Sequence, residues 1–353
     1  GNVNTLVSHT GDGVTTGNNQ SFDPVISSDG SRIAFGTQAT NLVSGVTDTN
    51  GTNIDVYMYT VFGNVNTLVS HTGDGVTTGN NQSFDPVISS DGSRIAFGTQ
   101  ATNLVSGVTD TNGTNIDVYM YTVFGNVNTL VSHTGDGVTT GNRSSIDPVI
   151  SSDGSRIAFE TFATNLVAGQ VDSNNTIDVF LFDRNTGITS LVSHTGDGVT
   201  TGNNASINPV ISSDGSRIAF ETLATNLVSG VTDSNGTITD LYLYTLSGNV
   251  NTLVSHTGDG VTTGNSSSFG PVISSDGSRI AFQTSATNLV SGVTDGDGTG
   301  SDIYLADAVT GTLEVVAPPA TPSATAIGAI NRGSIAGDGR YVVFVSDAPN
   351  LVA

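Results

Sequence analysis

A short pattern of acidic and amide side chains is the feature of this sequence best suited to chemistry. Its first copy is Asp48-Thr-Asn50-Gly-Thr-Asn-Ile-Asp55, in which side-chain oxygens flank a glycine. Ca²⁺ takes about six to eight oxygen ligands and tolerates flexible loops, but the glutamate that ends an EF-hand loop is missing here. We therefore predict a shorter calcium loop in each repeat. The predicted metal ligands are Asp48, Asn50, Asp55, Asp110, Asn112, Asp117, Asp172, Asn174, Asp178, Asp233, Asn235, Asp240, Asp295, Asp297 and Asp302.

A second interpretation of the pattern stays open. Asp and Asn side chains also form turns with their own backbone. The last Asp of each copy precedes an apolar run, so it would then only hold the start of a strand. The formal net charge of −22, with nine arginines and no lysine, favours the calcium interpretation. The same charge argues against nucleic acid and anionic membrane surfaces as partners, because both attract basic patches.

No other residue set predicts a catalytic or cofactor-binding site. Five histidines recur in the chain, and each ends a predicted outer strand, so the copies lie too far apart to share one metal ion. We expect them to be structural and to pair with an Asp of their own loop, as His9 would with Asp12. The arginine that opens the second strand of each repeat, such as Arg32, is expected to pair with Asp29. The five histidines are His9, His71, His133, His194 and His256.

The elements that position these side chains repeat along the chain. The string Ser-His-Thr-Gly-Asp-Gly begins at Ser8, Ser70, Ser132, Ser193 and Ser255, and residues 1–62 are identical to residues 63–124. Such a period is typical of solenoids, propellers and arrays. A group that occurs twice in identical surroundings is not a unique catalytic group, which favours a structural or binding role over catalysis.

Each repeat holds four short apolar runs, separated by turns rich in Gly, Asn and Asp. The first set covers Pro24–Ser28, Arg32–Phe35, Asp55–Tyr59 and Thr67–Ser70. No long window has a helical period, so the chain is predicted to be all-β. Four-stranded antiparallel units repeated around an axis form a β-propeller. We predict six blades in a single domain, 1–353, with repeats near 1–62, 63–124, 125–185, 186–247, 248–311 and 312–353.

The order of the runs predicts how the propeller closes. The run around Leu6 precedes the first inner strand, so this N-terminal strand is expected to join the last blade. The given sequence stops at Ala353, before a sixth run of the Asp55 type, so the last blade is expected to lack a third strand of its own. Three explanations stay open: an irregular blade, a natural chain that extends further, or a strand supplied by another chain. Self-association through that blade is therefore expected.

The repeat also resembles a known family. Residues 24–35, Pro-Val-Ile-Ser-Ser-Asp-Gly-Ser-Arg-Ile-Ala-Phe, followed by Asp-Val-Tyr-Met-Tyr, are similar to the repeat of bacterial TolB-like (WD-repeat-like) β-propellers. That family's pattern has a proline in the Ser-Pro-Asp-Gly turn, where this chain has Ser28, and the copy at 333–344 departs furthest. The resemblance implies the propeller fold, which serves scaffolds, binding platforms and parts of enzymes alike.

Composition and repeats together favour one function. The absence of cysteine suits a reducing cytosol and a cysteine-free secreted protein equally well. Because the composition is rich in Asn, Thr, Gly and Asp and has no Lys, we predict a secreted or cell-surface protein, and because no apolar run is long enough to cross a membrane, one that does not insert into the bilayer. We predict a non-catalytic extracellular structural, adhesion or interaction scaffold, stabilised by Ca²⁺. Two alternatives stay open, a module that binds a glycan or peptide and a propeller-type lyase or hydrolase. A protein or glycan partner is expected.

Overall fold

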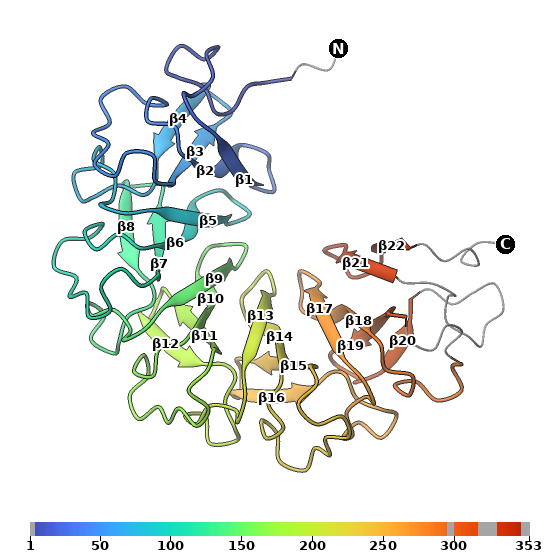
Figure 1. Ribbon diagram of the computed structural model, residues 1–353. Coiled ribbons are helices and arrows are strands. Elements are labelled where there is room, and N and C mark those ends of the chain that lie inside the picture. The colour runs from blue at the N-terminus through green and yellow to red at the C-terminus, as the bar shows by residue number, and fades with distance from the viewer. Residues whose placement is uncertain (1–3, 295–299, 317–329, 347–353) are drawn as a thin grey trace. The chain divides into compact units, whose positions relative to one another are not determined.

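The only regular elements in the described part of the chain are β-strands. The computed structural model describes residues 4–294, 300–316 and 330–346. The regular elements in these ranges are strands β1 to β22, in five four-stranded antiparallel sheets and one two-stranded sheet (Figure 1). None of the described residues lies in a helix of the length and apolar character needed to cross a membrane. The predicted all-β class is confirmed.

Two compact units divide the chain, Gly1–Ala168 with Leu181–Ser190, and Gly169–Phe180 with Leu191–Ala353. The first unit contains two complete sheets, each with its strands in sequence order. One sheet comprises β1 (Ser21–Ile26), β2 (Arg32–Thr37), β3 (Asp55–Thr60) and β4 (Val65–Leu68). The other comprises β5 (Ser83–Ile88), β6 (Arg94–Thr99), β7 (Asp117–Thr122) and β8 (Val127–Leu130).

The remaining sheets follow the same order. The third comprises β9 (Ser145–Ile150), β10 (Arg156–Thr161), β11 (Asp178–Asp183) and β12 (Ile188–Leu191). The second unit holds β13 (Ser206–Ile211), β14 (Arg217–Thr222), β15 (Asp240–Thr245) and β16 (Val250–Leu253) in one sheet. It also holds the sheet of β17 (Ser268–Ile273), β18 (Arg279–Thr284), β19 (Asp302–Asp307) and β20 (Leu313–Val315). The last sheet has β21 (Ile330–Ile335) and β22 (Val342–Ser346).

The first strand of each full sheet begins earlier than the sequence predicted. The predicted start was Pro24, but β1 starts at Ser21 and is interrupted by a bulge between Phe22 and Val25. Asp23 lies inside the bulge with φ of 49°. Proline has no N–H to give to a strand ladder, and a bulge is one of the few places in a sheet that tolerates it. The same bulge recurs in β5, β9, β13 and β17.

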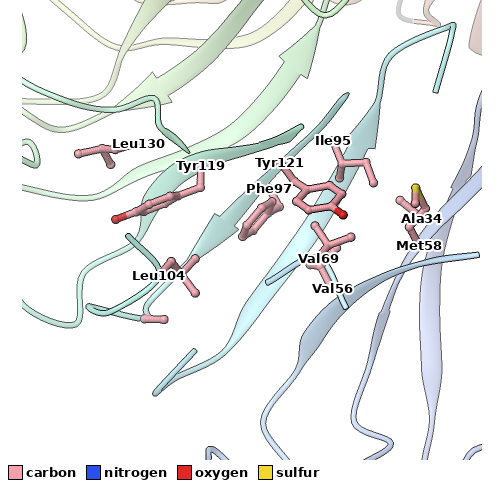
Figure 2. Packing of buried hydrophobic residues seen from close by; sticks show 11 residues of the cluster. Ala34, Val56, Met58, Val69, Ile95, Phe97, Leu104, Tyr119, Tyr121 and Leu130 are labelled. Carbon is pink, nitrogen blue, oxygen red and sulfur yellow. The ribbon is translucent and has the colours of Figure 1, made fainter. Parts of the chain in front are cut away.

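Apolar side chains from neighbouring sheets build the core. Figure 2 shows Val56 and Met58 of β3, and Val69 directly after β4, close to Ile95 and Tyr121 of the second sheet. Ile95 and Val56 are both 0% exposed. Burying a side chain of this size contributes about 1.5–3 kcal/mol, so the contacts between neighbouring sheets stabilise the fold.

Backbone hydrogen bonds between turns also join neighbouring sheets. The Ser-Asp-Gly turn of one sheet bonds to that of the next, with Ser28 N donating to Ser90 O at 2.9 Å and Ser90 N to Ser152 O at 2.9 Å. The second unit repeats the arrangement, from Ser213 to Ser275 and from Ser275 to Gly337. The turns that the sequence predicted within each repeat therefore also connect the repeats.

Closure by the N-terminal segment stays a prediction. Residues 4–7 lie in no strand, and residues 1–3 lie outside the described part of the chain. The last sheet has two strands among the described residues, so it is shorter than the others.

Candidate functional site

The structure brings the predicted metal ligands of the first repeat together in one loop. Asp48 Oδ1 accepts hydrogen bonds from the backbone N–H groups of Asn50 at 3.0 Å and Gly51 at 2.7 Å. Asn50 Nδ2 donates to Asp55 Oδ1 at 3.3 Å and to the carbonyl of Asn81 at 3.1 Å. Asp48 therefore shapes the turn, and Asn50 connects that turn to Asp55.

Asp55 is the buried member of the loop. It opens β3, is 4% exposed, and accepts a hydrogen bond from Ser70 Oγ at 3.1 Å. Burial, with a smaller contribution from the negative charge of Asp48, raises the pKa of Asp55 to about 7. The carboxyl thus titrates near neutral pH, where a bound cation would compete with its proton.

Three other described copies repeat this arrangement. The pKa is raised to about 7 for Asp117 and Asp240 and to about 8 for Asp178, with burial as the largest cause each time. Asp110, Asp172 and Asp233 form the same turn through their Oδ1 atoms. Asn112, Asn174 and Asn235 each donate to the buried Asp of their own loop. In the fifth copy Asp302 is buried at the start of β19, while Asp295 and Asp297 lie outside the described residues.

The side-chain amide oxygen of the loop asparagine lacks a hydrogen-bond donor in three copies and could instead be a cation ligand. The Oδ1 atoms of Asn50, Asn112 and Asn235 are buried and have no hydrogen-bond donor. A buried amide oxygen without a donor is unfavourable by roughly 1–3 kcal/mol, and an oxygen beside a buried carboxyl is the kind of ligand that Ca²⁺ prefers. The third repeat differs, because Asn174 Oδ1 accepts a hydrogen bond from Thr176 N at 2.7 Å.

Carboxylates alone do not make a metal centre in the part of the chain that the structure describes. No group of three or more His, Cys, Asp or Glu side chains is placed there to hold an ion. A cation in the Asp48 loop would need Asn50 and further oxygen ligands in addition to the two carboxylates.

Two expected ion pairs are absent. Asp12 accepts hydrogen bonds from the backbone and side chain of Thr15, from Val14 N and from Thr10 Oγ1, and none from His9. Arg32 Nη1 lies 3.4 Å from the carbonyl of Asp91 and 3.3 Å from that of Gly92, in the turn of the next sheet, and forms no ion pair with Asp29. The equivalent arginines of two other sheets do pair with an aspartate of their own sheet, Arg156 with Asp183 at 3.0 Å and Arg279 with Asp307 at 3.3 Å. Asp12 thus bonds within its own loop, whereas Arg32 reaches a turn that the spacing within one repeat did not indicate.

Sequence reasoning missed a cluster of three side chains at the junction between neighbouring repeats. His71 Nε2 lies 3.1 Å from Asn126 Oδ1, and the hydroxyl of Tyr121 donates to the same oxygen at 2.7 Å. His71 is 1% exposed and its ring meets that of Tyr121 edge-on at 5.7 Å. A spacing of 55 residues between His and Asn was present in the sequence, but it became meaningful only once the fold brought the two side chains together. The same cluster forms at His9 with Asn64 and Tyr59, and at His194 with Asn249 and Tyr244.

Known proteins resemble this chain in structure and not in sequence. No protein-family model and no curated protein matches the chain. An oligogalacturonate lyase in complex with manganese is similar with a TM-score of 0.52 at 13% identity, covering 99% of this chain and 81% of the other. The β-propeller domain of the Trilobed protease from Pyrococcus furiosus, with an open velcro topology, has a TM-score of 0.51 at 11% identity, covering 93% and 79%.

TolB from Acinetobacter baumannii is also among the similar structures. The TM-score is 0.40 at 15% identity, and the match covers 86% of this chain and 57% of that protein. This chain thus spans little more than half the length of that TolB. The repeated antiparallel sheets, together with the likeness to the lyase and the protease domain, establish that this chain has a β-propeller fold.

Proposed function

We propose that this chain is a non-catalytic scaffold or interaction module outside the cytoplasm, and that Ca²⁺ bound in its Asp-rich loops stabilises it. The lysine-free composition, rich in Asn, Thr, Gly and Asp, supports the location, and the net charge of −22 supports a cation. The repetition of one loop with the same hydrogen bonds supports a structural role, because each copy performs the same task.

One observation carries the calcium part of the proposal. In the first repeat, the buried Asp55 carboxyl and the buried Asn50 Oδ1, which has no donor, occur in the same loop as Asp48. Asp48, Asn50 and Asp55 would hold the ion, and the charge of Ca²⁺ would offset the unfavourable burial of negative charge.

Thermal unfolding at pH 8 in Ca²⁺ and in EDTA tests this proposal. We expect a higher Tm in Ca²⁺, because an ion that binds only the folded state stabilises it by about 2.7 kcal/mol at a concentration of 100 times Kd. The variant Asp117→Asn should lose part of this difference, because it removes one buried ligand charge.

A matched variant in the neighbouring loop controls for charge. Asp74→Asn makes the same change at an exposed carboxylate whose bonds are to Thr72, Val76 and Thr77, outside the predicted ligand set. It should lower the Tm in both solutions equally and leave the Ca²⁺ effect intact. Identical Tm values for the unsubstituted chain in Ca²⁺ and EDTA would disprove the calcium part.

An enzymatic function is the main alternative. Its support is the structural likeness to an oligogalacturonate lyase in complex with manganese, which at 13% identity concerns the fold alone. Release of unsaturated products from oligogalacturonate, with and without Mn²⁺, separates the two functions. Turnover would overturn the non-catalytic proposal, and stabilisation by Ca²⁺ without turnover would support it.

The proposed scaffold presents protein or glycan partners with a surface of repeated Asn- and Thr-rich loops. Glycan-array binding would favour the glycan-binding alternative over a purely structural role. Self-association through the last sheet is part of the same proposal, and sedimentation showing a monomer at all concentrations would contradict it.

A further inference from the structure

The cluster of histidine, asparagine and tyrosine is incomplete at two repeat junctions, those of His133 and His256, and a cavity opens at each. The cavity at His133 has an arginine in its lining. Its volume is about 540 Å³, and it lies in the first unit between the β7–β8 hairpin and the turn after β11. Its lining includes His133, Met120 and Leu130 on one side and Phe182, Arg184 and Gly187 on the other. None of the predicted calcium ligands lines it, so a ligand could occupy this cavity whether or not Ca²⁺ binds to the Asp-rich loops.

The identity of two residues explains the cavity. The turn after β11 has the same length as the turns after β3 and β7, and Gly187 stands where they have Asn64 and Asn126. Phe182 stands where they have Tyr59 and Tyr121, so both the amide and the hydroxyl that contact the histidine in the complete clusters are missing here.

The glycine facing the cluster gives an independent measure of the free space. A Cβ placed on Gly75 would lie 2.6 Å from Nδ2 of Asn126, and one on Gly198 would lie 2.7 Å from Nδ2 of Asn249. A Cβ on Gly137, the equivalent residue beside His133, would meet no atom within 4 Å. The volume that an asparagine side chain fills elsewhere in this chain is therefore open beside His133.

His133 is buried at this cavity with one nitrogen unpartnered. It is 5% exposed, and its ring meets Phe182 edge-on at 5.4 Å. Nδ1 lies 2.6 Å from the carbonyl oxygen of Thr134, which can only accept, so Nδ1 carries a proton. Nε2 has no hydrogen-bond partner among the described residues, whereas the equivalent atoms of His71 and His194 contact an asparagine amide.

Arg184 adds a positive charge to the same cavity. Arg184 is exposed and forms no ion pair with a described residue. Burial lowers the pKa of Arg94, and the positive charge of nearby Arg184 lowers it further. An exposed guanidinium without an ion-pair partner among the described residues is available to an anionic group of a ligand.

We propose that this cavity binds a small molecule that carries both a primary carboxamide and a carboxylate. The carboxamide takes the place of the missing asparagine side chain, and one of its N–H groups donates to His133 Nε2, which accepts because Nδ1 carries the proton. The carboxylate pairs with Arg184. Phe182, Met120 and Leu130 contact the aliphatic part between the two groups.

Titration with succinamate, followed through the side-chain nitrogen signals of the histidines by NMR, tests the proposal. The signal of His133 should shift and saturate, and those of His71 and His194, whose clusters are complete, should not. Acetamide should bind at the same place about three- to fivefold more weakly, since an exposed ion pair is worth about that factor. Arg184→Ala should reduce the affinity for succinamate to that for acetamide.

Two reciprocal variants make the test decisive. Gly187→Asn restores the residue that the complete clusters have, and it should fold because Asn64, Asn126 and Asn249 all adopt positive φ at this position. It should abolish the shift at His133. Asn126→Gly should make His71 respond to acetamide. A His133 signal that does not respond in the unsubstituted chain, or that still responds in Gly187→Asn, would overturn the proposal, and equal affinities for succinamate and acetamide would overturn the role of Arg184.

Discussion

The first two sheets have identical sequences but different surroundings. Residues 1–62 and 63–124 are the same, and β1–β2 and β5–β6 pair in the same register with the same bulge. Ile95 and Ser83 are 0% exposed, whereas Ile33 is only partly buried and Ser21 is exposed. The second sheet has the first packed against it, through β2 and β5. Local sequence therefore decides strand, turn and register, and the neighbouring sheet decides burial.

The hydrophobic clusters show the same difference. The cluster around Phe97 and Tyr121 includes Ala34, Val56, Met58 and Val69 from the preceding sheet. The equivalent cluster around Phe35 and Tyr59 draws its buried members from one sheet only. The first sheet thus lacks the contribution from a preceding sheet that completes the core of the second.

Truncating the same isoleucine in both sheets should reveal this difference most strongly. Ile95→Ala should lower the free energy of unfolding by about 2–4 kcal/mol, since it leaves a cavity in a closed core. Ile33→Ala should lower it by roughly half as much or less, because Ile33 is partly exposed. Urea unfolding of the two variants measures both. Equal losses would mean that another surface covers the first sheet in solution, as closure by the last blade or self-association would require.

The buried carboxyls Asp55 and Asp117 should affect the pH dependence of stability equally in the two sheets. Asp55 and Asp117 both have a pKa raised to about 7, from 3.8, mainly by burial. The folded chain then binds more protons than the unfolded chain between about pH 4 and pH 7, so the free energy of unfolding falls as the pH rises through this range.

Each such carboxyl lowers the free energy of unfolding by at most about 1.4 kcal/mol for each pH unit between about pH 4 and pH 7. Asp55→Asn and Asp117→Asn should each flatten the decline by the same amount, as urea unfolding in EDTA at several pH values would show. A decline that one variant flattens and the other leaves unchanged would show that the two loops differ in solution despite their shared sequence.

Substituting the exposed phenylalanine of either sheet should change the free energy of unfolding least. Phe62 and Phe124 lie in the turns after β3 and β7 and are 95% and 93% exposed. Phe62→Ser and Phe124→Ser should each change the free energy of unfolding by less than about 0.5 kcal/mol, because neither side chain is packed. Chemical unfolding of both variants checks this. A large loss for one of them would identify a contact that forms only between copies of the chain.

Much of the fold was predictable because the signals are local. Turn residues and β-branched or aromatic runs mark strands such as Asp55–Thr60 directly, and the repeat multiplied that evidence. The bulge at Asp23 was not predictable, since a proline at 24 reads as a strand start until its pairing partner is known. In the candidate calcium loop, the grouping of Asp48, Asn50 and Asp55 agrees with the spacing, and the binding of an ion there stays a prediction.

The sequence by itself determined the repeating β-strands, the acidic loops and the absence of thiol chemistry, since these depend on residues near one another in the chain or on composition alone. Only the tertiary structure decided that His71 meets Asn126 and Tyr121, that Arg32 reaches the turn of the next sheet, and that Gly187 leaves a cavity beside His133. These contacts join residues about 50 to 60 positions apart. Their geometry depends on how one sheet packs on the next, and a periodic sequence does not reveal that packing.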